Sequence, residues 1–404
     1  MWLKIRPQEP IIMGEVRADA QFLASKPYIP GRFLRGALAE WLKQNGRDDE
    51  EILSAVSGVW IGNFFPAADW KPLDYALPLP LSAASCKRAG GFRSRPARSG
   101  DESHGVVDLL LPQLAYHLLK EAGARFPVPF AVTCAECGDR LDTFGGFYAI
   151  YRDGEARYYL SVRPRYHAQT KVGLSRHRRA AAEGVLYTAS AISPWVPQPD
   201  RHSGRVPLIF LGRVHGDLGG IAQIKEALRF VALGALHTRG YGTVQVEDAE
   251  SGLPPLGQRL EGFNQALARV WKDVRELAAN KGDLPESPTG LYFSVDLLSR
   301  AVFQDWGMPS LIPRLAIVGR EVRPILWMTR PKTASGWSTA WGLPKPTNLA
   351  AQMGSVYVFH WDGSEQDLLP ALHALETGGV GERRDESYGE CLVCHPFHQE
   401  VEER

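Results

Sequence analysis

The sequence has no apolar run of the length that a transmembrane helix or a secretory signal peptide requires, and charges stand early, at Lys4 and Arg6. This pattern predicts a cytoplasmic protein. Cysteine is scarce, with five residues in 404. An odd number of cysteines that includes two C-x-x-C pairs, in a chain without an export signal, favours metal binding or free thiols over structural disulfides.

An excess of charge of one sign is also missing, because 46 Lys and Arg residues nearly balance 45 Asp and Glu residues and leave a net charge of +1. The overall charge therefore says nothing of a nucleic-acid partner, and only local clusters of basic residues are informative. Two such clusters occupy residues 87–98 and 171–179. They are compatible with a groove that binds a phosphate backbone, although a solvated face is the simpler interpretation of either cluster alone.

Three motifs that mark common enzyme classes are absent from the sequence: G-x-x-x-x-G-K-[ST], H-E-x-x-H and G-x-S-x-G. Metal-free cleavage of RNA stays open as an alternative, since it needs only a general acid and base near a 2′-hydroxyl. No pair of the candidate residues stands at a diagnostic spacing. The candidates are His167, His177 and His237. For a nuclease that relies instead on an acidic residue in a loop, Asp108 or Asp217 could be proposed, and nothing in the sequence singles out either.

The length fits two domains of roughly 150 to 200 residues each. In the first half, hydrophobic periodicity and turn residues predict the order strand, helix, long insertion, strand, helix, loop and strand. This is the split βαβ pattern of a ferredoxin-like domain. The predicted elements lie at residues 2–13, 33–46, about 60–200, 206–216, 221–235 and 237–250.

The second half repeats the end of this pattern. A helix-like stretch inside residues 251–290 marks a linker, and strands follow at residues 291–298 and 354–363. A short helix near Asp367, a glycine-rich loop and a last strand complete the chain. The sequence therefore predicts an α+β protein with a first ferredoxin-like (RRM-type) domain at residues 1–250, a helical linker, and a second such domain at residues 291–404.

Each predicted domain has a glycine-rich loop before its last strand. The first glycine-rich loop comprises residues 237–244 and the second comprises residues 379–390. Glycine lets backbone amides approach a phosphate closely, neighbouring arginines supply charge-assisted hydrogen bonds, and a tyrosine in each loop is a candidate for stacking on unpaired bases. Ordinary helix C-caps explain a single loop of this kind equally well, whereas two at matching positions favour RNA binding.

Cys134-x-x-Cys137 lies in the predicted insertion, together with Cys86 and His104. Three thiolates and one imidazole make a complete tetrahedral zinc set, and a small insertion with little core of its own would gain folding energy from the ion. His117 is the competing fourth ligand. The second pair, Cys391 and Cys394, lies on the presumed last strand and is interpreted as core packing, in preference to an all-thiolate site with Cys134 and Cys137 that would need close contact between the two domains.

Several segments resemble the RAMP superfamily of CRISPR-associated proteins. Residues 28–42 (YIPGRFLRGALAEWL) and 177–192 are similar to its signatures, and the glycine-rich loops are typical of it. The likeness extends to the large two-domain subunit of type III-D effector complexes, over the segments at residues 81–92, 103–114, 134–141, 336–350 and 354–363.

The resemblance implies a noncatalytic subunit that binds the repeat-derived 5′ end of the guide RNA (crRNA), or caps the RNA-bound filament, beside other RAMP subunits and a polymerase-like large subunit. A protein-only scaffold is a third possibility. The residues expected to contact RNA lie at the helix start after Pro30, in the two basic clusters and in the two loops. They are Gly31, Arg32, Arg35, Lys87, Arg88, His167, Lys171, Arg176, His237, Arg239, Gly240, Tyr241, Gly242, Gly381, Arg383, Arg384, Tyr388 and Gly389.

Overall fold

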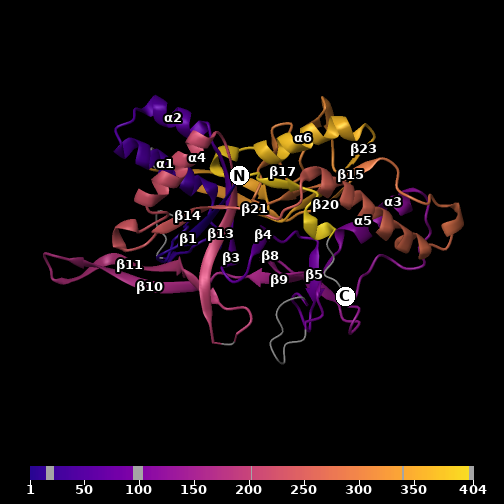
Figure 1. Ribbon diagram of the computed structural model, residues 1–404, viewed down its shortest axis with the longest axis horizontal. Coiled ribbons are helices and arrows are strands. Elements are labelled where there is room, and N and C mark those ends of the chain that lie inside the picture. The colour runs from indigo at the N-terminus through magenta and orange to yellow at the C-terminus, as the bar shows by residue number, and fades with distance from the viewer. Residues whose placement is uncertain (15–21, 94–102, 202, 339–340, 400–404) are drawn as a thin grey trace.

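The structure is a computed structural model that describes residues 1–14, 22–93, 103–201, 203–338 and 341–399 (Figure 1). It is a mixed α+β protein with antiparallel sheets. Within those residues, no helix is both long and apolar enough to cross a membrane. The strands and helices predicted from periodicity are confirmed as elements, and the order in which they pair is described below.

The first main sheet has the strand order β12-β13-β1-β14, and β3 pairs with the same edge of β13 as β12 does. All of its pairings are antiparallel. Helices α1 and α4 pack against each other, and α2 follows α1 (Figure 1). The elements are β1 (Trp2–Pro7), α1 (Gly31–Gln44), α2 (Asp49–Ser57), β3 (Trp60–Ala68), β12 (Trp195–Pro197), β13 (Arg205–His215), α4 (Leu218–Phe230) and β14 (Val244–Ala249).

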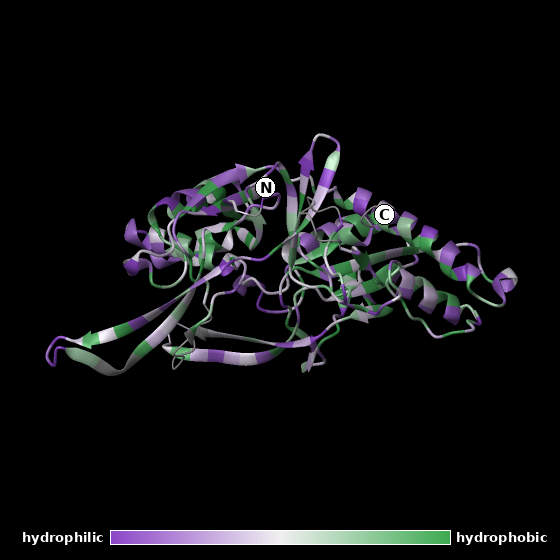
Figure 2. Ribbon diagram, turned by 90° about the horizontal axis from the view of Figure 1, so that it is seen from below, coloured by the Kyte–Doolittle hydropathy of each residue, from purple (hydrophilic) through white to green (hydrophobic). Residues whose placement is uncertain are grey.

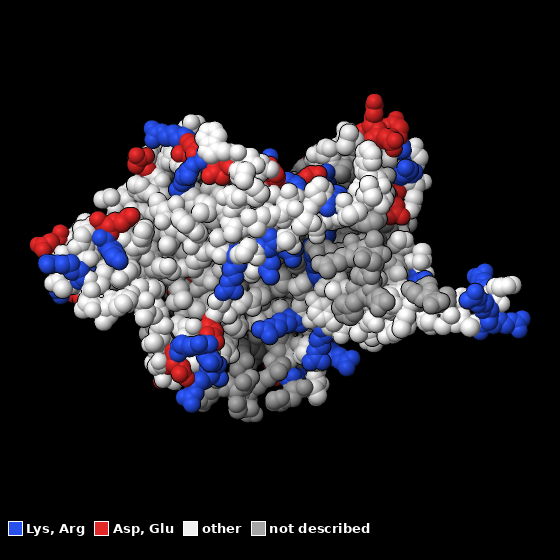
Figure 3. Space-filling view, turned by 180° about the vertical axis from the view of Figure 1, so that it is seen from behind, with Lys and Arg blue, Asp and Glu red and all other residues white. Residues whose placement is uncertain are grey.

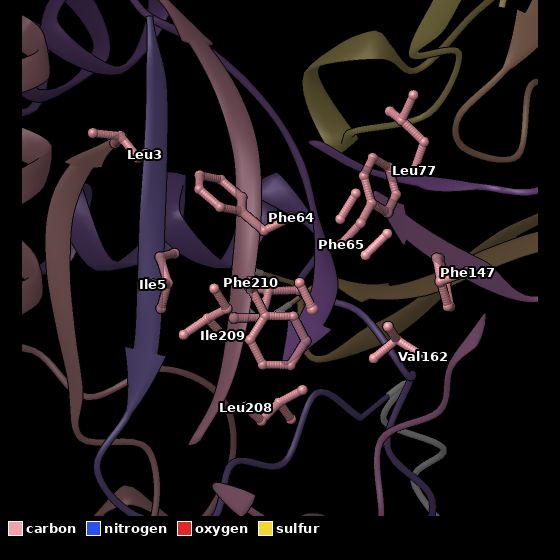
Figure 4. Close-up of a cluster of buried hydrophobic side chains, with 14 of the residues drawn as sticks. Leu3, Ile5, Phe64, Phe65, Leu77, Phe147, Val162, Leu208, Ile209 and Phe210 are labelled. Carbon is pink, nitrogen blue, oxygen red and sulfur yellow. The ribbon is translucent and has the colours of Figure 1, made fainter. Parts of the chain in front are cut away.

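Strand β3 has both faces covered, which explains why nearly all of its residues are buried. Helix α1 contacts it, and so do strands of the insertion. Phe64 is fully buried, and the ring of Phe65 stacks on Phe147 of the insertion with 5.8 Å between ring centroids (Figure 4). Residues 60–68, placed in the insertion by the sequence pattern, therefore lie in the main sheet and anchor the insertion to it.

The segment between β3 and β12 folds into two small sheets and a long hairpin. The hairpin predicted at Asp153-Gly154 is confirmed, because Asp153 pairs with Ala156 across the turn. A second hairpin, formed by β10 and β11, extends away from the body (Figures 1 and 2). The elements are β4 (Leu73–Pro78), β5 (Ala83–Cys86), β6 (Val106–Asp108), α3 (Leu110–Glu121), β7 (Leu141–Thr143), β8 (Phe147–Asp153), β9 (Ala156–Val162), β10 (Tyr166–Ser175) and β11 (Ala180–Ile192), with β2 (Phe22–Leu23) beside β11.

The second main sheet has the order β20-β23-β15-β24. Helix α5 contacts both α3 and β15, and α6 contacts β24. Short hairpins occupy the chain between β15 and β20. The elements are α5 (Leu256–Glu276), β15 (Leu291–Leu297), β16 (Phe303–Asp305), β17 (Met308–Ser310), β18 (Leu315–Ile317), β19 (Arg320–Val322), β20 (Leu326–Met328), β21 (Pro331–Ser338), β22 (Leu343–Ala351), β23 (Val356–Trp361), α6 (Glu365–Gly378) and β24 (Cys391–Val393).

Buried polar contacts join the two halves. The carboxylate of Glu390, which is 3% exposed, accepts hydrogen bonds from the backbone and side-chain amides of Asn63 on β3, each at 2.7 Å. Arg213 on β13 donates to the same carboxylate at 3.3 Å and to the carbonyl of Cys391 at 3.0 Å. Because a buried charge is costly unless it is paired and hydrogen-bonded, this arrangement fixes the end of the second glycine-rich loop against the first sheet.

Candidate metal cluster and nucleic-acid surface

The insertion brings the four predicted metal ligands together. The donor atoms of Cys86, His104, Cys134 and Cys137 all lie within 4.8 Å of one another. The sulfurs of Cys86 and Cys137 are 3.5 Å apart, and Nδ1 of His104 is 3.3 Å from the sulfur of Cys134. A tetrahedral site needs about four such donors, so the set is geometrically complete.

Local backbone structure explains this convergence. Cys86 ends β5, and His104 lies two residues before the strand β6 that pairs with β5. The C-x-x-C segment forms a tight turn, in which the amide of Gly138 donates to the carbonyl of Cys134 at 2.9 Å. Burial raises the pKa of the Cys134 thiol, but the amides of Cys137 and Glu136 and the ring of His104 outweigh burial and lower this pKa to about 6. Cys134 is therefore poised to act as a thiolate.

The alternative metal ligands lie elsewhere. His117 is on α3, where its ring faces Glu121 at 3.5 Å, and it is outside the cluster. Cys391 and Cys394 are fully buried in the second core, and burial raises the pKa of both thiols. These two cysteines pack as core residues, as the sequence indicated.

The first glycine-rich loop lies against the base of the β10–β11 hairpin. The exposed Arg239 donates a hydrogen bond to the hydroxyl of Tyr187 on β11. Tyr241 is only 5% exposed, and its hydroxyl donates to the side chain of Gln169 on β10. Lys171 lies over the Tyr241 ring, 5.3 Å from its centroid. Loop and hairpin therefore form one continuous surface, in which the Tyr241 ring packs inside the protein.

The remaining loop residues divide by exposure. His237 and Gly240 are exposed, and Gly240 has a left-handed backbone with φ of 79°. Gly242 is buried, and its amide donates to the carbonyl of Pro10 at 3.1 Å. On the hairpin, His167 and Arg176 are both exposed. Lys and Arg side chains gather at the hairpin tip and across the middle of the face shown in Figure 3.

The start of α1 is a packing feature. Gly31 is buried against β3, and a Cβ atom added there would lie well inside van der Waals contact with the carbonyl oxygens of Ile61 and Gly62. Arg32 and Arg35 are partly exposed, with Arg32 over the ring of Phe33 at 5.4 Å. Glycine is therefore needed here for the close approach of helix and strand.

The second glycine-rich loop is largely held by the protein itself. Arg383 donates to Glu386 at 2.9 Å and to the side chain of Asn348 at 3.0 Å, and it lies over the ring of Tyr388. Tyr388 is 5% exposed and donates to the carbonyl of Ser335 at 3.1 Å. The buried Gly389 leaves no room for a Cβ atom beside Val380. Gly381 and Arg384 are the exposed predicted residues of this loop.

Lys87 and Arg88 are exposed beside the metal cluster, and Arg88 reaches Asp139 at 3.3 Å. The carboxylates considered for catalysis have structural partners. Asp217 caps α4 by accepting from the amide of Gly220 at 2.6 Å. Asp108 faces the ring of the fully buried His398 at 3.0 Å.

Sequence reasoning missed three arginines, Arg163, Arg165 and Arg205, which line surface cavities next to His167. The available signal was the Arg-Pro-Arg pattern after a predicted strand. Alternate residues of an extended chain point to the same side, so the pattern places two charges together. Nothing in the sequence indicated that Arg205 lies beside them.

The fold and surface define an α+β protein of antiparallel sheets with a Cys/His cluster and a basic hairpin beside a glycine-rich loop. The model of the RAMP superfamily matches residues 4–245, and the model described as CRISPR-associated protein (Cas_Cmr3) matches residues 164–396. Each match covers more than half of the chain. The chain therefore belongs to the RAMP superfamily and to the CRISPR-associated Cas_Cmr3 family.

Solved structures give more distant likenesses. A chain of the type III-B Cmr-beta complex bound to cognate target RNA and AMPPnP is 13% identical, with 89% of this chain and 86% of that chain covered and a TM-score of 0.41. A chain of the Csm3-Csm4 subcomplex of a type III-A interference complex is 13% identical, with 91% and 96% covered and a TM-score of 0.34. A chain of a Csm1-Csm4 cassette in complex with pppApA is 14% identical, with 88% and 86% covered and a TM-score of 0.29. No curated protein matches the chain.

Proposed function

We propose that this protein is a guide-RNA-binding structural subunit of a type III CRISPR effector complex, of the III-D subtype. In this role it contacts the repeat-derived 5′ end of the guide RNA or caps the RNA-bound filament. Its partners are other RAMP subunits and the polymerase-like large subunit. Membership of the RAMP superfamily and the Cas_Cmr3 family supports the CRISPR part of the proposal, and the residue segments noted above support the III-D subtype.

The main support for RNA binding is the contact between Arg239 and Tyr187, which joins the first glycine-rich loop to the β10–β11 hairpin. It places Arg239, His237 and Lys171 on one surface, although they come from segments far apart in the sequence. Arginine and lysine side chains on a continuous surface are the usual means of binding a phosphate backbone. The exposed Arg176 extends this basic surface to the hairpin tip.

We further propose two ferredoxin-like domains, at residues 1–250 and 291–404, with α5 as part of the linker. In the first, the order β14-β1-β13-β3 with α1 after β1 and α4 after β13 supports this architecture. In the second, the order β24-β15-β23-β20 with α6 after β23 supports it. Short hairpins stand where the first helix of the second domain is expected.

The cofactor we propose is one structural zinc ion, held by Cys86, His104, Cys134 and Cys137. Three sulfurs and one nitrogen within 4.8 Å of one another suit a closed tetrahedral zinc site. The strands β5, β6 and β7 around the site have only three or four residues each. Sheets this short bury little apolar surface, so the metal would supply much of their folding energy.

The experiment that tests the function is binding of repeat-containing RNA at several salt concentrations. We expect salt-dependent binding that is weaker in Arg239→Ala, with a salt slope lower by about one unit. The matched control is Arg229→Ala on α4, whose exposed guanidinium pairs with Glu226. Absence of salt-dependent binding, alone and in the assembled complex, would contradict the proposal.

The same RNA tests for catalysis. Incubation of labelled repeat RNA with and without divalent metal should leave it intact. Site-specific cuts that disappear in His237→Ala would contradict the proposed noncatalytic role and would show that the protein is an endoribonuclease. Equal assembly of the complex with and without RNA would favour a protein-only scaffold.

A further inference from the structure

A surface cavity of about 560 Å³ lies between the end of β9 and strand β12. Volumes of 300 to 1,000 Å³ are typical of pockets that hold organic ligands. Two arginines, Arg163 and Arg165, lie on its wall. Its other walls are largely apolar and aromatic, and they include Phe92, Phe144, Tyr159, Val162 and Val196.

A second cavity, of about 160 Å³, continues from the first, because Arg165, Val196 and Pro197 line both. It adds Arg205 and two large aromatic residues, Tyr166 and Trp195. Tyr166 is 45% exposed and Trp195 is 48% exposed, so both present ring surface to solvent. We call the two cavities together the arginine groove.

Among the residues that the structure describes, no hydrogen bond or ion pair involves the guanidinium of Arg163, Arg165 or Arg205. Some arginines elsewhere in the chain are paired, such as Arg152 with Asp74 at 2.6 Å and Arg259 with Glu376 at 2.8 Å. Three guanidinium groups around one groove that lack a partner in the described part of the chain, in a protein of net charge +1, indicate an anionic ligand.

The groove leads directly to the first glycine-rich loop. His167, Gln169 and Lys171 occupy alternate positions of β10, so they share a face of the strand. Nε2 of Gln169 lies 3.1 Å from Nε2 of His167, and Gln169 and Lys171 both contact Tyr241. One face of β10 therefore connects the groove to the surface assigned to RNA above.

We propose that the arginine groove binds two consecutive unpaired nucleotides of an RNA strand. One base enters the larger, aromatic-lined cavity and the next stacks on Trp195, while Arg165, which lines both cavities, contacts the phosphate between them. Aromatic faces combined with arginine are how proteins hold single-stranded RNA, and charge complementarity selects a phosphate-bearing ligand over a neutral one. This inference rests on the proposed function and assigns a site that the glycine-rich loops do not include.

The test uses the full chain with repeat RNA carrying 4-thiouridine at successive positions. We expect one or two adjacent positions to crosslink to peptides containing residues 159–167 or Trp195. Arg163→Ala/Arg165→Ala should weaken RNA binding by about tenfold or more and lower the salt slope by about one unit. The matched control is Arg269→Ala, an exposed arginine on α5, which should bind like the wild type.

A second variant separates stacking from a folding defect. The RNA that lacks the base at the crosslinked position should bind the wild-type protein about tenfold more weakly than the intact RNA does, which is within the range expected for one stacked base. The Trp195→Leu variant should bind the two RNAs equally. If repeat RNA binds the double arginine variant normally and crosslinks elsewhere, the groove is not an RNA-binding site, while the proposed function stays intact. A crosslink from the groove to a neighbouring protein in the complex would also contradict the groove as an RNA-binding site. Failure of the wild type to bind repeat RNA would overturn both.

Discussion

Nε2 of His398 lies 2.8 Å from Oδ1 of Asp296, and Nδ1 of the same ring lies 3.0 Å from Oδ2 of Asp108. The three residues come from the C-terminal segment, from β15 of the second sheet and from β6 of the insertion. All three side chains are almost completely buried. Burial alone would lower the pKa of His398, but the two carboxylates outweigh it and raise this pKa to about 10. A buried imidazolium thus joins three distant parts of the chain.

This contact predicts a pH dependence of stability. Because the folded-state pKa of His398 is raised from 6.5 to about 10, its contribution is complete below about pH 6.5 and is lost as the pH rises through 10. His398→Gln should therefore lower the free energy of unfolding by about 3–5 kcal/mol at pH 6, since it leaves two buried carboxylates without their cation. The difference from the wild type should shrink toward pH 10.

Denaturant titrations between pH 6 and 10 measure this difference. The control is His373→Gln, an exposed histidine on α6, which should follow the wild type at every pH. A His398→Gln variant whose loss of stability is the same at pH 6 and pH 10 would show that the ring is not held as a cation.

Gly31 and Gly36 on α1 offer a matched pair of substitutions. Gly31→Ala places a methyl group against the backbone of β3, whereas nothing lies within 4 Å of a Cβ atom at Gly36. We expect Gly31→Ala to destabilise the protein by about 1–3 kcal/mol through overpacking. Gly36→Ala should stabilise it by about 0.5–1 kcal/mol, because alanine is the better helix former. Thermal denaturation of both variants measures this, and equal effects would contradict the packing role of Gly31.

The outcome at Gly31 shows what a motif can and cannot predict. The Pro-Gly-Arg segment correctly predicted a helix start, because a strand, a turn and apolar residues at helical spacing are local features. The residues of this segment were also expected to contact RNA, and the structure gives Gly31 a separate reason to be glycine, because the carbonyl oxygens of Ile61 and Gly62 leave no room for a Cβ atom. That contact depends on how β3 pairs with β13, which no local pattern encodes.

The metal cluster predicts one tightly bound zinc ion per chain. Cys134→Ser should reduce the zinc content to well below one ion and destabilise the insertion, since a closed site needs about four ligands. Cys391→Ser is the matched control, a buried cysteine outside the cluster that should leave the zinc content unchanged. Metal analysis of the purified protein measures both. A wild-type protein that holds no zinc would contradict the proposed zinc site.

Local sequence spacing was sufficient to predict which residues form the metal cluster, because the C-x-x-C turn and the β5–β6 pair both form within the insertion. The groove could not be found in the same way. Arg165 and Arg205 line the same cavity although they are far apart in the sequence, and the pairing of β12 with the first residues of β13 sets Arg205 opposite Pro197, which also lines it. The burial of Tyr241 and Tyr388 was equally hidden, since their partners Gln169 and Ser335 lie on separate hairpins.

The two glycine-rich loops predict different effects of arginine substitutions. Arg383 is held by Glu386 and Asn348, so Arg383→Ala should cost about 1–3 kcal/mol of stability. Its effect on RNA affinity should be smaller than that of Arg239→Ala, because Arg239 is exposed beside the β10–β11 hairpin. Denaturation and RNA titrations of the two variants make the comparison. An Arg383→Ala variant of normal stability that fails to bind RNA would contradict this comparison, because it would make the second glycine-rich loop the more important one for RNA binding.

The proposed function depends most directly on which RNA the protein holds in its own cells. Affinity purification of the tagged full chain, followed by sequencing of the RNA that copurifies with it, measures this directly. We expect strong enrichment of short RNAs that carry repeat-derived 5′ ends, and a loss of that enrichment in Arg163→Ala/Arg165→Ala combined with Arg239→Ala. Recovery of the effector subunits with no repeat-derived RNA would contradict the proposal that this chain binds the guide.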